Sequence, residues 1–149
     1  MSRSLFAVAV AALMLGATVG SVAAESVDLS GVVVIVNASQ GVTTISTAEL
    51  TKLFLKKSTK WENGTAVVPV DQAPNALPRC TFTDKVLGKT PSAVNSYWQQ
   101  QVFSGAGVPP EILAGDEAVV AFVKQNVGAV GYVSAEAKLD GVKALTVTQ

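Results

Sequence analysis

Few residues of this sequence could carry out catalytic chemistry. The chain contains no histidine and one cysteine, Cys80, which excludes Ser-His-Asp and Cys-His catalytic groups and metal sites built on histidine or clustered thiolates. No serine is followed three residues later by lysine, and no dinucleotide or Walker-type glycine loop follows a predicted strand. We therefore expect a protein that is not an enzyme and that uses no metal and no cofactor.

The remaining reactive groups have structural explanations. Asp116 and Glu117 form the only adjacent pair of carboxylates, and they stand at a predicted helix start, where negative charge is favourable. Cys80 is expected to be a small buried residue, because free cysteine is one of the most frequently buried residue types. A covalent dimer through Cys80 is the alternative.

Polar residues that follow predicted strands are the better candidates for a site. Asn37 and Ser39 come after the first strand, and Gln72, Asn75 and Arg79 come after the second. Open α/β sheets bind their ligands beyond the carboxyl ends of strands. These five side chains are therefore candidate contacts for a small anionic or polar ligand.

The strands that would position them show two patterns. Residues 32–36 are an unbroken run of β-branched residues, typical of a strand buried on both faces of a parallel or mixed sheet. Residues 67–70 form a second strand, which Pro69 should place at a sheet edge or bring to an end, because proline donates no ladder hydrogen bond. Two last strands are expected in residues 129–133 and 142–147.

Four helices are predicted between these strands. The spacing of Ser46 and Glu49 is that of a capping box at the start of a helix over residues 47–56. Thr90 and Pro91 suit the cap and first position of another helix. The other two contain residues 82–87, ending at Gly88, and begin at Asp116. Alternating strands and helices predict an α/β domain with a mixed, mostly parallel sheet flanked by about four helices.

The first 24 residues have the layout of a cleavable signal peptide, with Arg3, an apolar run over residues 5–15 and small residues ending at Ala24. A retained membrane anchor is the alternative. Residues 25–149 then form one domain, periplasmic or secreted, with no stable membrane insertion after cleavage. This part carries 10 basic and 11 acidic residues, a balance that disfavours nucleic acid as a partner.

Five segments, in order, resemble the phosphate-type substrate-binding proteins of bacterial ABC importers, which have the type II periplasmic binding fold. They are residues 34–37, residues 49–57 with Trp61 close behind, residues 68–71, Tyr97-Trp98 and residues 128–133. The resemblance implies one lobe of such a protein, without a cofactor. The aromatic residues of these segments are expected to pack, and Gly128 and Gly131 to allow close backbone approach.

The sequence departs from this family in two respects. Phosphate-binding members carry a Ser-Gly-Thr tripeptide after the second strand, whereas Ala76-Leu77-Pro78 stands there in this chain, which removes two hydroxyls and a backbone donor. Full receptors also enclose the ligand between two lobes joined by a hinge, and this chain is long enough for one.

Two functions follow from the resemblance and its departures. The first is an exported binding module that recognises a small anion such as phosphate, or another polar ligand, weakly or together with a partner. The alternative is an accessory or sensor protein of the cell envelope that binds another protein and no ligand. An envelope protein or a second copy of the chain are the partners considered.

Overall fold

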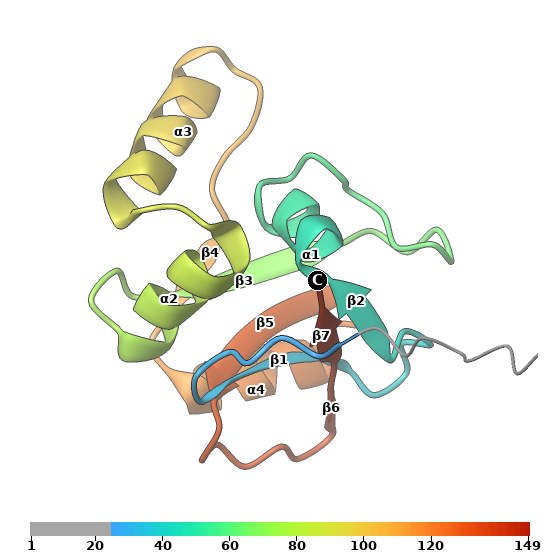
Figure 1. Cartoon of the computed structure of the whole chain (residues 1–149). Helices are drawn as coiled ribbons and strands as arrows, with labels where there is room; N and C mark the ends of the chain where they lie inside the picture. Colours follow the sequence, from blue (N-terminus) through green and yellow to red (C-terminus); the bar gives the residue numbers. More distant parts are fainter. Residues whose placement is uncertain (1–24) are drawn as a thin grey trace, which may run out of the picture.

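A five-stranded mixed sheet in the order β4-β3-β5-β1-β6 forms the centre of the lobe (Figure 1). The computed structural model describes residues 25–149, so the signal peptide predicted for residues 1–24 lies outside the described residues. The strands of this sheet are β1 (Val32–Asn37), β3 (Val68–Gln72), β4 (Glu111–Leu113), β5 (Ala129–Ser134) and β6 (Val142–Ala144). Two short strands, β2 (Thr44–Ser46) and β7 (Thr146–Thr148), pair separately.

The strand directions confirm the predicted mixed sheet. Strand β3 runs parallel to β4 and β5, and β2 runs parallel to β7, whereas β1 is antiparallel to β5 and β6. Three of the five strand pairings in residues 25–149 are thus parallel. β1 and β3 run in opposite directions, because β1 is antiparallel and β3 parallel to β5. The carboxyl end of β1 therefore lies at one end of the strands, and the carboxyl end of β3 at the other; these two borders of the sheet are called its edges below.

Helices cover both faces of this sheet, as the apolar sequence of β1 predicts. On one face, Val34 and Tyr132 pack with Leu50 and Phe82 of the helices α1 (Thr47–Phe54) and α2 (Leu77–Phe82). On the other face, Ile35 packs with residues of α4 (Asp116–Gln125). The central residues of β1 are fully buried, which explains why none of them is polar.

The predicted helix starts are confirmed where a local cap fixes them. The Ser46 hydroxyl accepts a hydrogen bond of 3.2 Å from the Glu49 amide at the start of α1. The Thr90 hydroxyl accepts one of 3.1 Å from the Ala93 amide at the start of α3 (Pro91–Phe103). Helix α2 continues into a π-helical turn, Thr83–Leu87, and ends at Gly88, which has a φ of 59°.

Pro69 does not place its strand at an edge, so that prediction is wrong. Strand β3 lies between β4 and β5. The Val68 amide donates to the Gly128 carbonyl on the β5 side, so the nitrogen of the next residue faces the β4 side. Pairing with β4 begins only at Val70, and the missing donor of Pro69 therefore costs no ladder hydrogen bond.

Three other features differ from the prediction. Cys80 is exposed rather than buried, because it lies on the outer side of α2, whose inward residue is Phe82. Residues 142–147 do not form one strand but contribute to two different sheets. Strands β2 and β4, each of three residues, were not predicted, since such short segments show no clear alternation of apolar and polar residues.

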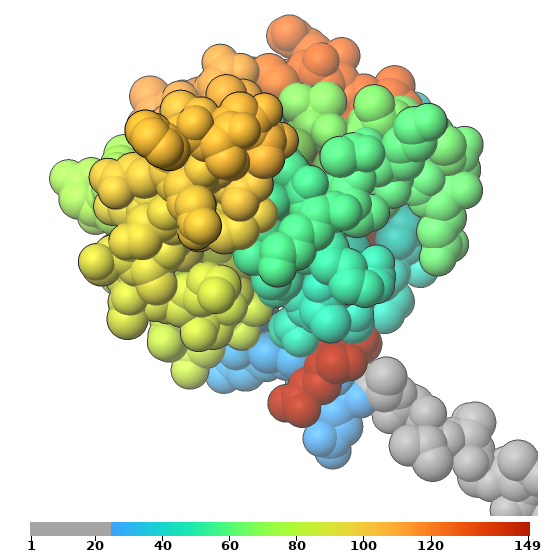
Figure 2. Space-filling view, turned by 90° about the horizontal axis from the view of Figure 1, so that it is seen from above, coloured from blue at the N-terminus to red at the C-terminus, as the bar shows by residue number. Residues whose placement is uncertain are grey.

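Helix α3 projects from the rest of the lobe (Figure 1). Its buried residues, Val94 and Trp98, pack with Leu55 after the end of α1. The Tyr97 hydroxyl donates a hydrogen bond of 2.8 Å to the Leu55 carbonyl. Seen from above, α3 and the loop after it form a broad part of one face, beside α1 and the segment after it (Figure 2).

The first and last described segments lie side by side. The Val27 amide donates a hydrogen bond of 2.7 Å to the Val147 carbonyl, and Ser26 forms an isolated antiparallel bridge with Thr148. Within residues 25–149, no helix combines the length and apolar character needed to span a membrane.

Candidate functional site

Arg79 is held by groups of its own lobe at the carboxyl end of β3. Its Nη1 donates a hydrogen bond of 2.8 Å to the Gln72 carbonyl, and its Nε lies 3.5 Å from Asp71 Oδ1. The Arg79 side chain is only 13% exposed, so the pair is shielded from solvent. The Asp71 carboxylate also accepts a hydrogen bond from the Tyr132 hydroxyl. The charge that would attract an anion is therefore already opposed by an internal carboxylate.

Gln72 uses its side-chain amide inside the protein. The residue is 2% exposed. Its Nε2 donates hydrogen bonds of 2.9 Å to the Tyr132 carbonyl and 3.0 Å to Asp116 Oδ1. Because both hydrogens of this amide have partners, the side chain connects β3, β5 and the start of α4.

Two ionisable groups around Gln72 have displaced pKa values. Burial, followed by the nearby negative charge of Asp71 and the hydrogen bond to it, raises the pKa of the Tyr132 hydroxyl. Burial also opposes ionisation of Asp116, but hydrogen bonds from Ser134 and Gln72 outweigh it and lower the pKa of this carboxyl below its ordinary value of 3.8. At neutral pH, Tyr132 is thus a neutral donor and Asp116 a charged acceptor.

The loop between Gln72 and Arg79 offers no hydroxyl to a ligand. Asn75 is exposed. Ala76 occupies the cap position of α2 without a side-chain hydrogen bond, and proline follows within the first helical positions. Leu77 is 77% exposed. This edge of the sheet therefore presents an apolar side chain at the place where the resemblance leads one to expect hydroxyl groups.

Asn37 and Ser39 lie at the opposite edge of the sheet. Asn37 Nδ2 donates to the carbonyls of Val123 and Lys124 at distances of 2.9 and 3.0 Å, and its Oδ1 accepts a hydrogen bond from the Ser39 amide. Asn37 is buried and stabilises the end of α4, whereas Ser39 is exposed. Four of the five candidate residues thus form two separate pairs, Asn37 with Ser39 at one end of the sheet and Gln72 with Arg79 at the other.

A mostly apolar groove of about 490 Å³ lies beside Arg79. It is lined by residues of the loop after β3, of α2, and of α3 and β4 with the loop between them, including Pro74, Arg79, Trp98, Phe103 and Ile112. The Phe103 side chain is 96% exposed. Sequence reasoning identified Trp98 as a packing residue, which is correct, but did not predict the groove, because β4 was not predicted.

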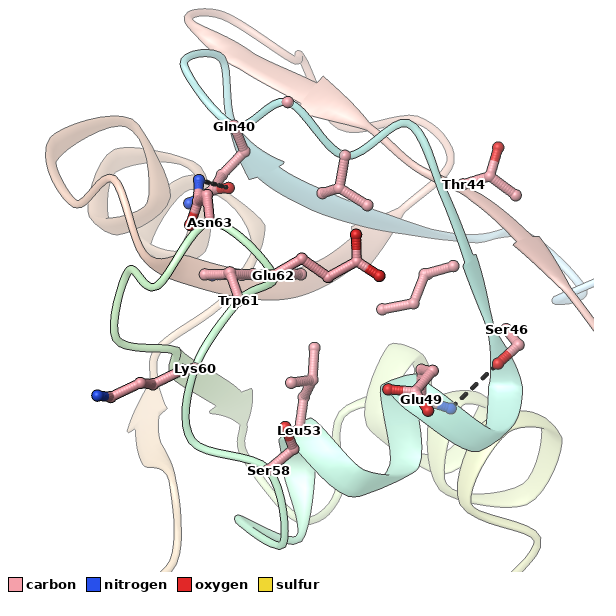
Figure 3. Close-up of a pocket in the computed structure, with 13 residues that line it drawn as sticks. Gln40, Thr44, Ser46, Glu49, Leu53, Ser58, Lys60, Trp61, Glu62 and Asn63 are labelled. Carbon is pink, nitrogen blue, oxygen red and sulfur yellow. Dashed lines mark hydrogen bonds between the residues drawn. The ribbon is translucent and has the colours of Figure 1, made fainter.

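A second cavity of about 400 Å³ lies near the opposite edge and is bordered by α1, β2 and the loop containing Trp61 (Figure 3). Trp61 is 8% exposed and its Nε1 donates a hydrogen bond of 3.0 Å to the Gly128 carbonyl. This confirms the predicted packing role. The cavity was not predicted from the sequence, because the short strand β2 that borders it was not predicted.

Gly128 and Gly131 allow close approach, as predicted. A Cβ at position 128 would lie 1.9 Å from the Ala66 carbonyl oxygen, and one at position 131 would lie 2.7 Å from Val119 Cγ1. Both distances are far shorter than a normal contact, so only glycine fits at these places.

Solved structures with a similar fold include proteins named for phosphate transport. A putative phosphate ABC transporter substrate-binding protein with bound phosphate, from Clostridium perfringens, matches 83% of this chain with 20% identity and a TM-score of 0.63. An ABC-type phosphate transport receptor from Vibrio cholerae matches 78% with 19% identity and a TM-score of 0.61. PstS from Borrelia burgdorferi matches 84% with 12% identity and a TM-score of 0.59.

The match extends over about half of each larger protein. This chain covers 48%, 46% and 49% of the three chains, in the same order. No protein-family model matches the sequence, and a search of curated proteins finds no significant relative. The likeness confirms the fold that the sequence resemblance implied, over about half the length of each larger chain.

Proposed function

We propose that this chain is an exported protein built as one lobe of a solute-binding protein, and that it works by pairing with another protein. The fold, the half-length match and one exposed face of the lobe support this function. The signal peptide expected in residues 1–24 would deliver the protein to the periplasm or the medium.

The observation that carries the proposal is an exposed apolar surface, which we call the α3 face and define by Val102, Phe103, Val108 and Ile112. These four side chains are 53%, 96%, 62% and 53% exposed. Residues 90–110 contain no Asp, Glu, Lys or Arg. Protein interfaces are depleted of charge at their centres and enriched in aromatic residues, and exposed apolar patches on soluble proteins commonly mark them.

The groove beside Arg79 is by itself poorly suited to capture a small ligand. Binding sites usually bury most of the ligand surface, whereas the groove beside the α3 face is open along one side of the lobe. A protein that covers this face would close the groove. The partner we expect is therefore a protein with an apolar contact surface, and a second copy of this chain meets that requirement.

Phosphate capture by the isolated lobe is not part of this proposal. An anion that approached Arg79 would have to compete with Asp71, which lies 3.5 Å from its Nε, and the start of α2 supplies no side-chain hydroxyl. We expect isothermal calorimetry with phosphate, sulfate and small organic acids to detect no tight binding to the monomer.

The pairing is tested by placing a photo-cross-linking amino acid at position 103 in the full chain. The control position is Lys138, an exposed residue that lines a different cavity, next to α4. Illumination of intact cells should give a specific protein adduct from position 103 and none from position 138. Analytical ultracentrifugation of the purified protein then separates a homodimer from a different partner.

The proposal fails if position 103 gives no adduct and the purified protein stays monomeric at all concentrations. With the cross-linking amino acid moved to position 108 of the same face, Phe103→Ser should lower the adduct yield, because removal of the exposed ring weakens the association without unfolding the lobe. Equal adduct yields at positions 103 and 138 would also contradict a specific α3 face.

A further inference from the structure

The cavity next to Trp61 has the volume of a small-molecule site. We call it the Trp61 pocket and define it by Gln40, Ile45, Glu49, Leu53, Trp61 and Glu62. Its volume of about 400 Å³ lies within the range of ligand pockets. Ile45, Leu53 and Trp61 are buried and give it an apolar floor. It lies away from the α3 face and at a different edge from Arg79.

Several hydrogen-bond donors around this pocket already have partners in the protein. The indole N–H of Trp61 donates to the Gly128 carbonyl. The Gln40 amide nitrogen donates to the Val127 carbonyl at 2.8 Å, and its oxygen accepts from Asn63 at 3.3 Å. Trp61 and Gln40 therefore have little to offer an anion, which needs free donors.

The charged groups favour the opposite kind of ligand. Lys60 also borders the cavity, but in Figure 3 its side chain leads away from the cavity, whereas the Glu62 side chain extends into it. Glu62 takes part in no ion pair within residues 25–149. Glu49, on the α1 side of the same space, pairs with Lys52 at 2.8 Å, but both side chains are more than half exposed, so this pair is weak and easily exchanged.

We infer that the Trp61 pocket binds a small organic cation, an amine or quaternary ammonium compound with an apolar body. The cationic group would pair with the Glu62 carboxylate, with Glu49 as a second acceptor. The apolar part would lie against Ile45, Leu53 and the accessible part of the Trp61 ring, which also attracts cations through its π electrons. This site differs in charge from a phosphate site and does not depend on the proposed pairing through the α3 face.

Tryptophan fluorescence offers a direct test, because the chain has two tryptophans and a Trp98→Phe background leaves Trp61 as the only reporter. Choline and putrescine are the probes, and sodium phosphate is the anionic counterpart. Both amines should change the Trp61 emission saturably, whereas phosphate should not. Glu62 is exposed, so Glu62→Gln, which keeps the shape and removes the charge, should weaken amine binding by about threefold, as expected for the loss of an exposed charge pair.

Glu136→Gln is the matched control, since Glu136 is an exposed carboxylate outside the Trp61 pocket, and it should leave amine binding unchanged. Phe103→Ser should also leave it unchanged, which separates this site from the α3 face. The inference is overturned if neither amine gives a saturable response, if Glu62→Gln and Glu136→Gln bind equally well, or if phosphate gives the same response. Circular dichroism of each variant verifies that the lobe is folded.

Discussion

Replacement of Gln72 by leucine tests whether this residue stabilises the fold or serves as a ligand contact. The two side chains have similar volume, so the change removes hydrogen bonds with little change in packing. In the structure, Gln72 Nε2 donates to the Tyr132 carbonyl and to Asp116 Oδ1, and the residue is 2% exposed. Gln72→Leu should therefore destabilise the protein.

The expected size of the effect follows from these two bonds. A buried carbonyl that loses its partner costs about 1–3 kcal/mol, and a hydrogen bond to a charged group contributes about 1.5–3 kcal/mol. Burial of the additional apolar surface of leucine stabilises the folded state by about 1 kcal/mol. We expect the free energy of unfolding to fall by about 3 kcal/mol, which for a domain of this size lowers Tm by about 10 °C.

Urea unfolding followed by tryptophan fluorescence measures this loss, with Gln100→Leu as the control. Gln100 lies on the exposed side of α3, so the same substitution there should change the free energy of unfolding by less than about 0.5 kcal/mol. A Gln72→Leu variant as stable as the wild type would refute the structural role, and it would return Gln72 to the candidate ligand contacts.

Three further outcomes are expected. Gly128→Ala should lower the free energy of unfolding by at least about 2 kcal/mol in urea denaturation, because the added Cβ would lie 1.9 Å from the Ala66 carbonyl oxygen; an unchanged midpoint would contradict the close approach. The pKa of Asp116 is lower in the folded state than its ordinary value of 3.8, so its ionisation stabilises the fold above pH 3.8 and this stability is lost as the pH falls below it. Asp116→Asn should flatten the acid side of the stability curve, and an identical curve would argue against this pKa shift. Cys80 is exposed and should react with a thiol reagent in the native protein, whereas slow reaction that requires denaturant would indicate a buried thiol.

Features fixed by neighbouring residues were predictable from the sequence. The cap of α1 at Ser46 and the cap of α3 at Thr90 need only a hydroxyl and the amide three residues on. The burial of β1 follows from its unbroken β-branched sequence. These signals are local, so they do not depend on how the rest of the chain folds.

Features that depend on distant pairing were not predictable. Nothing in residues 32–37 determines that β1 runs antiparallel to β5, and this direction alone moves Asn37 away from Gln72. The ion pair between Arg79 and Asp71 likewise depends on how α2 packs against β3. The candidate residues were thus recognised as polar positions next to strands, but their separation into two edges required the sheet topology.

The bridge between Ser26 and Thr148 brings the two ends of the described lobe to one place on its surface. A domain whose ends emerge side by side can be inserted into a loop of another protein, or joined end to end and opened elsewhere, without breaking its core. The loop between α3 and β4, which contains Gly105 and Gly107, would be a suitable place for new ends. The lobe can therefore be inserted as a unit into another protein or circularly permuted, which makes it a suitable part for fused sensors.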